Sequence, residues 1–193
     1  MKEKFSSFLQ FDRKWLSSWN KFANNAGIFQ GILKFVSEYL IYSLPVILII
    51  TWFWSAKSKI VSLKALFSAG LAAILSNIIG RIINRPRPFE VSGVHELVFH
   101  RPSYSFPSDH ATVLFAVAFA FYFAGYKKLF WFVLALAIII SFSRIVTGLH
   151  YPSDIISGAI LGILVAAIIW RLQRPLSYIY NLIIIVAKKL RLA

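Results

Sequence analysis

Three polar clusters in this chain combine residue types that suit phosphoryl chemistry. The first is RPRPF at residues 85–89, and the second is FPSDH at residues 106–110. The third is the string SFSRIVTGLHYPSD, which carries Arg144, His150 and Asp154. Each cluster stands at an end of an apolar run, where charged side chains usually serve a function. Guanidinium, imidazole and carboxylate groups are therefore the first candidates for chemistry.

The arginines of these clusters suit a phosphate or diphosphate ligand. Arg85, Arg87 and Arg144 keep their positive charge and present fork-shaped donors that match phosphate oxygens. Ser108 stands where a helix should begin, and the unpaired amides of a first helical turn attract anions. We therefore expect these four residues to bind phosphate. The alternative is that Ser108 and Asp109 only cap the helix.

Two histidines are the candidate catalytic groups. His150 and Asp154 are four residues apart, so the carboxylate can accept from one imidazole nitrogen while the other faces the substrate as a nucleophile. His110, at the opening of another helix, is placed to donate a proton to a leaving oxygen. A lone interfacial histidine is more often structural, but two histidines beside carboxylates and near arginines favour catalysis. A metal site at His150 and Asp154 lacks a third ligand nearby, so we expect neither metal nor cofactor.

Composition indicates the environment in which these clusters lie. The chain has 193 residues, is 59% hydrophobic and only 15% charged, and contains 18 Phe and 6 Trp. This is more apolar side chain than one soluble domain of that size needs. The net charge of +14 fits the basic loops of a membrane protein and attraction to anionic head groups. We therefore expect a membrane lipid as partner and no nucleic acid, whereas the sequence does not indicate the oligomeric state.

Five segments are candidate spans, because about 20 predominantly apolar residues cross a bilayer. They are residues 31–54, 63–83, 111–126, 129–149 and 155–170. Residues 1–25 alternate aromatic and basic side chains, a pattern that favours an interfacial helix. Residues 176–193 are predicted to be an amphipathic tail or a sixth span. We expect one all-α domain over residues 1–193, a polytopic helical bundle with five or six transmembrane helices.

This order of spans brings the three clusters to one side of the membrane. RPRPF follows the second span, FPSDH precedes the third, and the His150 string joins the fourth to the fifth. The opposite side receives the basic segments 55–59 and 126–128, with Arg171 and Arg174. Because an excess of Lys and Arg marks the cytoplasmic side, we expect the clusters to face away from the cytoplasm at the plasma membrane.

The three clusters resemble the signature of the type-2 phosphatidic acid phosphatase superfamily. Its third part, S-R-x5-H-x3-D, is met in full by Ser143, Arg144, His150 and Asp154. Its second part is usually P-S-G-H, and Asp109 replaces the glycine. This replacement, the pair Glu38 and Tyr39, and the run RPRPF are similar to the undecaprenyl-diphosphatases of the bacitracin-resistance type within the superfamily.

One position departs from that signature. The family's first part is K-x6-R-P, and counting back from Arg87 places Gly80 at the lysine position. The resemblance implies that Arg81 or Arg85 supplies the missing charge. The departure also argues against a glycerophospholipid substrate.

The resemblance implies a two-step hydrolysis. His150 attacks the terminal phosphorus while Asp154 holds its ring, and His110 protonates the departing lipid phosphate and then activates water. Phosphate oxygens are bound by Arg87, Arg144, Ser108, and Arg81 or Arg85. The implied reaction converts undecaprenyl diphosphate to undecaprenyl phosphate through a phosphohistidine.

Three alternatives stay open at this point. The first is a phosphatase for phosphatidic acid, phosphatidylglycerophosphate or lipid A phosphate. The second is a small transporter or a scaffold that binds anionic lipid without chemistry. The third is haloperoxidase chemistry, which fits poorly with so hydrophobic a chain.

Two further carboxylates are candidate accessory groups. Glu38 lies within the first span, where an unpaired carboxylate is costly enough to be a functional candidate. It could instead pair with Lys34, one helical turn away. Asp109, beside the candidate acid His110, is the second accessory candidate.

Overall fold

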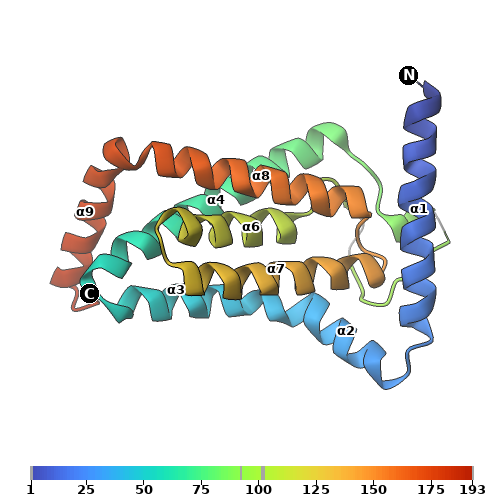
Figure 1. Cartoon of the computed structure of the whole chain (residues 1–193), viewed down its shortest axis with the longest axis horizontal. Helices are drawn as coiled ribbons and strands as arrows, with labels where there is room; N and C mark the ends of the chain where they lie inside the picture. Colours follow the sequence, from blue (N-terminus) through green and yellow to red (C-terminus); the bar gives the residue numbers. More distant parts are fainter. Residues whose placement is uncertain (1, 92, 101–102, 193) are drawn as a thin grey trace.

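The bundle is built from helices that lie along one axis and two that cross its ends. The computed structural model describes residues 2–91, 93–100 and 103–192, so Met1, Ser92, Arg101, Pro102 and Ala193 lie outside the described residues. The elements are α1 (Lys2–Asn24), α2 (Ile28–Tyr39), η1 (Leu40–Tyr42), α3 (Ser43–Trp54), α4 (Ala56–Ile83), α5 (Pro88–Val91), α6 (Asp109–Phe123), α7 (Lys127–Val146), α8 (Pro152–Arg171) and α9 (Gln173–Lys189). Figure 1 shows α1 across one end and α9 across the other. The predicted all-helical bundle is confirmed.

Long apolar helices make this chain a multi-pass membrane protein. Four segments of the described chain are long and apolar enough to span: Ile28–Trp54, Ala56–Glu90, Lys127–Val146 and Pro152–Arg171. Helix α6, in the place of the third predicted span, is apolar but shorter than these four segments. Large apolar side chains cover the outside of the bundle, such as Ile82 at 77% exposure, which suits contact with lipid. The tail helix α9 is not among the spanning segments and crosses the bundle end, so the sixth-span alternative gains no support.

The first span is broken into two helices, which the sequence analysis did not predict. Helices α2 and α3 are separated by the short 3₁₀ turn η1. Pro45 explains the break, because proline has no amide hydrogen and its ring crowds the carbonyl of the residue four positions earlier, Ile41. The tighter 3₁₀ turn replaces the lost helical geometry at that point.

Helix α4 starts earlier than the predicted span at 63–83. It begins at Ala56 because Ser55 and Ser58 form a capping box, in which each side chain bonds the backbone amide of the other. It ends at Asn84, whose left-handed backbone has a φ of 48°. The prolines of RPRPF then prevent the helix from continuing. This sharp stop turns the arginines of the motif toward the end of the bundle that α1 crosses.

Helix α6 is central and packs closely against α8. A methyl group added at Gly162 of α8 would lie 2.3 Å from the carbonyl oxygen of Thr112 on α6. Small residues at such a crossing let two helix backbones approach each other in a membrane bundle. Figure 1 shows α6 between α8 and α7, and the contacts place it against α4, α7 and α8. The close approach fixes the start of α6 beside the start of α8.

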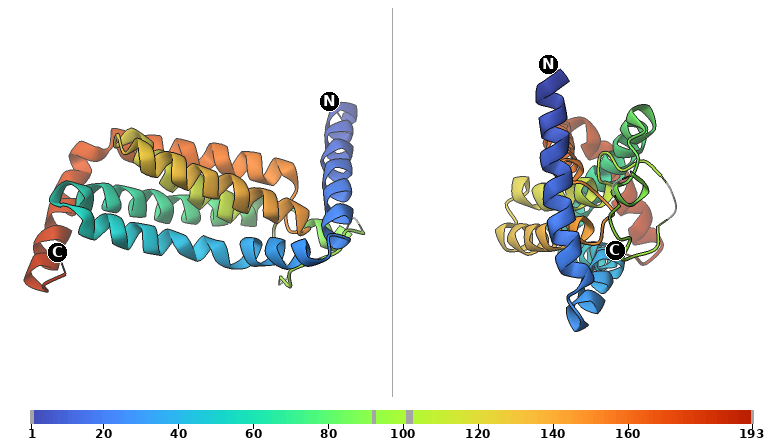
Figure 2. Two further views of the ribbon diagram at one scale, coloured as in Figure 1. Left: turned by 60° about the horizontal axis from the view of Figure 1, so that its bottom comes forward. Right: turned by 90° about the vertical axis from the view of Figure 1, so that its right-hand side faces the viewer.

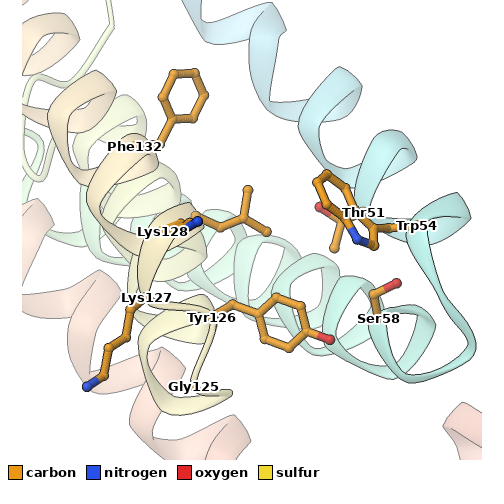
Figure 3. Close-up of a pocket in the computed structure, with 9 residues that line it drawn as sticks. Thr51, Trp54, Ser58, Gly125, Tyr126, Lys127, Lys128 and Phe132 are labelled. Carbon is orange, nitrogen blue, oxygen red and sulfur yellow. The ribbon is translucent and has the colours of Figure 1, made fainter.

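A cavity of about 650 Å³ lies at the end of the bundle opposite α1. It is lined by the end of α3, the start of α4 and the α6–α7 turn. Figure 3 shows Tyr126 pointing from that turn toward Ser58. None of the residues with predicted chemistry lines this cavity. Those residues lie at the other end, which α1 crosses.

Candidate active site

His150 lies buried in the connection between α7 and α8, where its ring is held from both nitrogens. Nδ1 lies 2.8 Å from the carbonyl oxygen of Ser105, and Nε2 lies 3.2 Å from Nη1 of Arg87. Because a carbonyl oxygen can only accept, Nδ1 carries the proton and Nε2 presents its lone pair. Burial, followed by the positive charges of Arg87, Arg144 and His110, lowers the pKa of His150 well below its usual value. The ring is therefore neutral at physiological pH, as a nucleophile must be.

Asp154 lies near this ring but does not bond it directly. Its Oδ2 is 3.7 Å from Nδ1 of His150, within ion-pair distance but too far for a hydrogen bond. That oxygen accepts from the amide of Tyr151 at 2.9 Å, and Oδ1 accepts from Arg85 at 2.7 Å. The predicted hydrogen bond between Asp154 and the imidazole is corrected by this geometry. The carbonyl of Ser105 takes that place, and Asp154 stands behind it as a nearby negative charge.

Arg85 contacts carboxylates of the protein. Its Nη2 donates to Asp12 at 2.8 Å, and its Nη1 donates to Asp154 at 2.7 Å. Its guanidinium carbon lies 3.8 Å from the ring centre of Tyr151. These contacts occupy the fork that the sequence analysis expected to bind phosphate. Arg85 therefore serves to orient Asp154 in this structure.

Tyr104 explains the missing family lysine at position 80. Its ring covers Gly80 so closely that even a methyl group there would lie 2.2 Å from Cδ2 of the tyrosine. The hydroxyl of Tyr104 is fixed by Asn77, whose side-chain amide donates to it at 2.6 Å. A lysine at position 80 would need this ring to move. The neighbouring Arg81 is exposed at the last turn of α4.

Arg87 and Arg144 are buried cations without an acidic partner. They are 4% and 3% exposed, and neither forms an ion pair within the part of the chain that the structure describes. Arg87 donates to the carbonyl of Leu149 at 3.0 Å and to Ser103 at 3.1 Å, and Arg144 donates to the carbonyl of Ser37 at 3.1 Å. Burying a charge without a counterion is costly. Two such charges beside a histidine form a candidate anion site.

Unused donors accompany these charges. Among the described residues, Nε of Arg144 and the hydroxyl of Ser108 are buried and have no hydrogen-bond partner. Buried polar groups are normally paired, so an unpaired one calls for an explanation. A bound phosphate would supply acceptors for both. The backbone amide of Ser108 is occupied, because it donates to the carbonyl of Asp154 at 3.1 Å.

The remaining predicted residues interact electrostatically with these arginines. His110 is half-buried in the first turn of α6, where its imidazole lies in the electrostatic field of Arg144 and Arg87. Asp109 is exposed and accepts from the hydroxyl of Ser76. Glu38 is exposed on α2, and the structure gives it no ion pair with Lys34 among the described residues.

The loop between α5 and α6 also approaches the arginines. His100 is half-buried there, and burial, with the charges of Arg87 and Arg144, lowers its pKa to about 4. The loop is fixed at Leu97, whose amide donates to the carbonyl of Thr147 at 3.2 Å. This segment therefore lies within the electrostatic field of the anion site.

Three partners of the site were not predicted from sequence. The carbonyl of Ser105 gives no sequence signal, because any residue carries one. Ser103, which binds Arg87, stands in a loop without a helical period. Asp12 did leave a signal: with Glu3 it is one of two acidic residues in the basic and aromatic segment 1–25.

Membrane-spanning helices that bring buried arginines without carboxylate partners to a histidine are consistent with an integral membrane phosphatase. The profile of the PAP2 superfamily matches residues 62–178, and the chain belongs to this superfamily. The resemblance inferred from the three motifs is thus confirmed.

Individual relatives refine this placement. The chain is 32% identical to the bacitracin transport permease protein BcrC of Bacillus licheniformis, over 84% of this chain and 83% of that protein. It is 29% identical to the undecaprenyl-diphosphatase BcrC of Bacillus subtilis, over 84% of each. The fold is similar to the crystal structure of a transmembrane PAP2 type phosphatidylglycerolphosphate phosphatase from Bacillus subtilis, with a TM-score of 0.61, 20% identity, and coverage of 88% of this chain and 87% of that chain.

Proposed function

We propose that this protein hydrolyses the terminal phosphate of undecaprenyl diphosphate and releases undecaprenyl phosphate and inorganic phosphate. The observation that carries the proposal is the pair of buried, carboxylate-free guanidiniums of Arg87 and Arg144 beside the neutral ring of His150. The choice of an isoprenoid diphosphate is supported by similarity to the undecaprenyl-diphosphatase BcrC. It is also supported by Tyr104, which fills the space of the lysine expected for a glycerophospholipid phosphatase.

In the first step, Nε2 of His150 attacks the terminal phosphorus. A P–N bond forms while the bond from that phosphorus to the bridging oxygen breaks, so undecaprenyl phosphate departs. His110 donates a proton to the departing oxygen. The proton on Nδ1 stays in its hydrogen bond to Ser105, and the positive charge that develops on the ring is stabilised by Asp154 at 3.7 Å.

The arginines stabilise the charge on the phosphoryl oxygens during this step. Arg87 lies beside the attacking nitrogen, while Arg144 and Ser108 hold unused donors for the same group. Donors that are fixed before the reaction stabilise a transition state without reorganising at that moment. Arg81 stays a candidate for the outer phosphate or the lipid surface, because its exposed position leaves it free to move.

In the second step, His110, which gave up its proton in the first step, takes a proton from water. The oxygen of that water attacks phosphorus and the P–N bond breaks, which restores His150 and releases phosphate. Asp109 and Glu38 are proposed as accessory groups, because both carboxylates attract the buried charge of Arg144.

The site is proposed to face the outside of the plasma membrane. The opposite end of the bundle carries many basic residues: Lys57, Lys59, Lys127, Lys128, Arg171, Arg174, Lys188 and Lys189. Basic residues in short loops favour the cytoplasmic side. The end with His150 would then lie at the outer surface.

A substrate panel with purified protein and a metal chelator tests this proposal. We expect kcat/KM for phosphate release from undecaprenyl diphosphate to exceed that from phosphatidic acid, phosphatidylglycerophosphate and lipid A phosphate by about tenfold or more. The chelator should leave the rate unchanged. Faster release from phosphatidic acid would contradict the substrate. Release from no lipid would instead favour a lipid-binding scaffold or a transporter. The Bacillus licheniformis relative is named as a transport permease.

A further inference from the structure

The amino-terminal helix α1 carries a buried polar face across the end of the bundle that holds the site. Asp12 and Asn20 are 2% and 1% exposed, and Leu16 between them is fully buried. These positions recur every four residues and therefore lie on one side of the helix. Figure 2 shows α1 running across the ends of the other helices. A helix that only lay on the membrane surface would not bury a carboxylate, so α1 also packs against the bundle.

Asp12 uses both of its oxygens to hold the start of α8. Oδ1 accepts from the amide of Ser153 at 3.0 Å, and Oδ2 accepts from the hydroxyl of the same serine. Oδ2 also accepts from Nη2 of Arg85 at 2.8 Å. Ser153 is the residue directly before Asp154. Asp12 thus contacts both the backbone and the arginine that position the orienting carboxylate.

Arg85 joins the two carboxylates in a fixed geometry. One nitrogen of its guanidinium donates to Asp12, and the other donates to Asp154 and to Ser153 at 2.7 Å each. Stacking on Tyr151 holds the guanidinium plane. One positive charge is shared between two acids, so Asp154 is not fully neutralised by Arg85. The two carboxylates and the one guanidinium together therefore place a net negative charge beside the ring of His150.

We infer that Asp12 is a positioning residue for the reaction, because through Arg85 and Ser153 it fixes the direction of Asp154 beside His150 and adds a second negative charge to the group around Arg85. This inference rests on the proposed hydrolysis. Without Asp12, Arg85 pairs with Asp154 alone and the amide of Ser153 loses its acceptor. The imidazolium that forms when His150 attacks is then stabilised by a weaker negative potential. The phosphate-binding groups Arg87, Arg144 and Ser108 do not contact Asp12.

Kinetics of full-length Asp12→Asn test the inference, with Lys14→Gln as the matched control on the exposed side of α1. We expect kcat for undecaprenyl diphosphate to fall about tenfold or more. KM and the inhibition constant of inorganic phosphate should stay within about twofold, because the phosphate-binding groups Arg87, Arg144 and Ser108 are unchanged. Lys14→Gln should match wild type. A full kcat in Asp12→Asn, or an equal loss of phosphate affinity, would overturn the inference.

A second variant tests whether Asp12 acts through Arg85. In Arg85→Lys the charge remains, but a single ammonium does not reproduce the fork that bridges two carboxylates. We expect the same loss of kcat, and the double variant should be no slower than Arg85→Lys alone. Losses that multiply would mean that Asp12 acts independently of Arg85, against the inference. Wild-type protein that is inactive on every substrate would instead refute the proposed function.

Discussion

Replacement of His150 by alanine should reduce phosphate release from undecaprenyl diphosphate by at least about a thousandfold. Nε2 of this residue is the proposed attacking atom, and its neutral state is set by burial and by the charges of Arg87 and Arg144. Within the described part of the chain, the ring nitrogens meet a donor of Arg87 and the carbonyl oxygen of Ser105, and neither group can attack phosphorus in place of the imidazole. Initial rates of phosphate release with purified protein measure this effect.

The matched control for this variant is His95→Ala. The His95 side chain is exposed, and Asn20 contacts only its backbone, so the rate should stay within about twofold of wild type. Circular dichroism and thermal unfolding should show that His150→Ala is folded. A folded His150→Ala protein with wild-type turnover would remove His150 from the mechanism.

Arg144→Gln should separate activity from stability. We expect kcat to fall about a hundredfold or more, because a fixed charge aimed at the phosphoryl oxygens is lost. We expect the midpoint of thermal unfolding to hold or rise, because the variant removes a buried charge that no carboxylate of the described chain balances. Kinetics and a melting curve in the same detergent measure both quantities.

The control for this variant is Arg171→Gln at the far end of the bundle. Arg171 is exposed, so its loss should change neither turnover nor the unfolding midpoint appreciably. If Arg144→Gln melted well below wild type and kept its turnover, Arg144 would be a structural residue and not a phosphate-binding one.

The sequence alone predicted which ends of the helices meet. Successive spans alternate in direction, so the end of α4, the start of α6 and the α7–α8 connection must lie on one side of the membrane. The residue types at those three points were sufficient to suggest an anion site and a histidine. Hydropathy placed the spans well where no charge interrupts them.

Hydropathy was less informative at helix ends and breaks. Lys57 and Lys59 lower the mean hydropathy at the start of α4, so the predicted span began at residue 63 although the capping box starts the helix at Ala56. Pro45 sits three positions inside α3, and its effect falls on the turn before it. Local hydrogen bonding decided these bounds.

The detailed partners of the site could not be read from residue types. The ring of His150 is fixed by the carbonyl of Ser105, which depends on the path of the α5–α6 loop. Arg85 stands beside Arg87 in the motif, yet it turns to Asp12 on a helix more than seventy residues earlier. Pairing of such distant residues follows from how α1 crosses the bundle, which no local pattern encodes.

The central claim is that the terminal phosphoryl group forms a covalent bond to Nε2 of His150 before it is released. A rapid-quench experiment tests this most directly. Undecaprenyl diphosphate labelled at its terminal phosphate is mixed with excess protein, quenched in alkali within one turnover, and digested for peptide mapping. The account predicts label on His150. Turnover without covalent label, or label on any other residue, would contradict it.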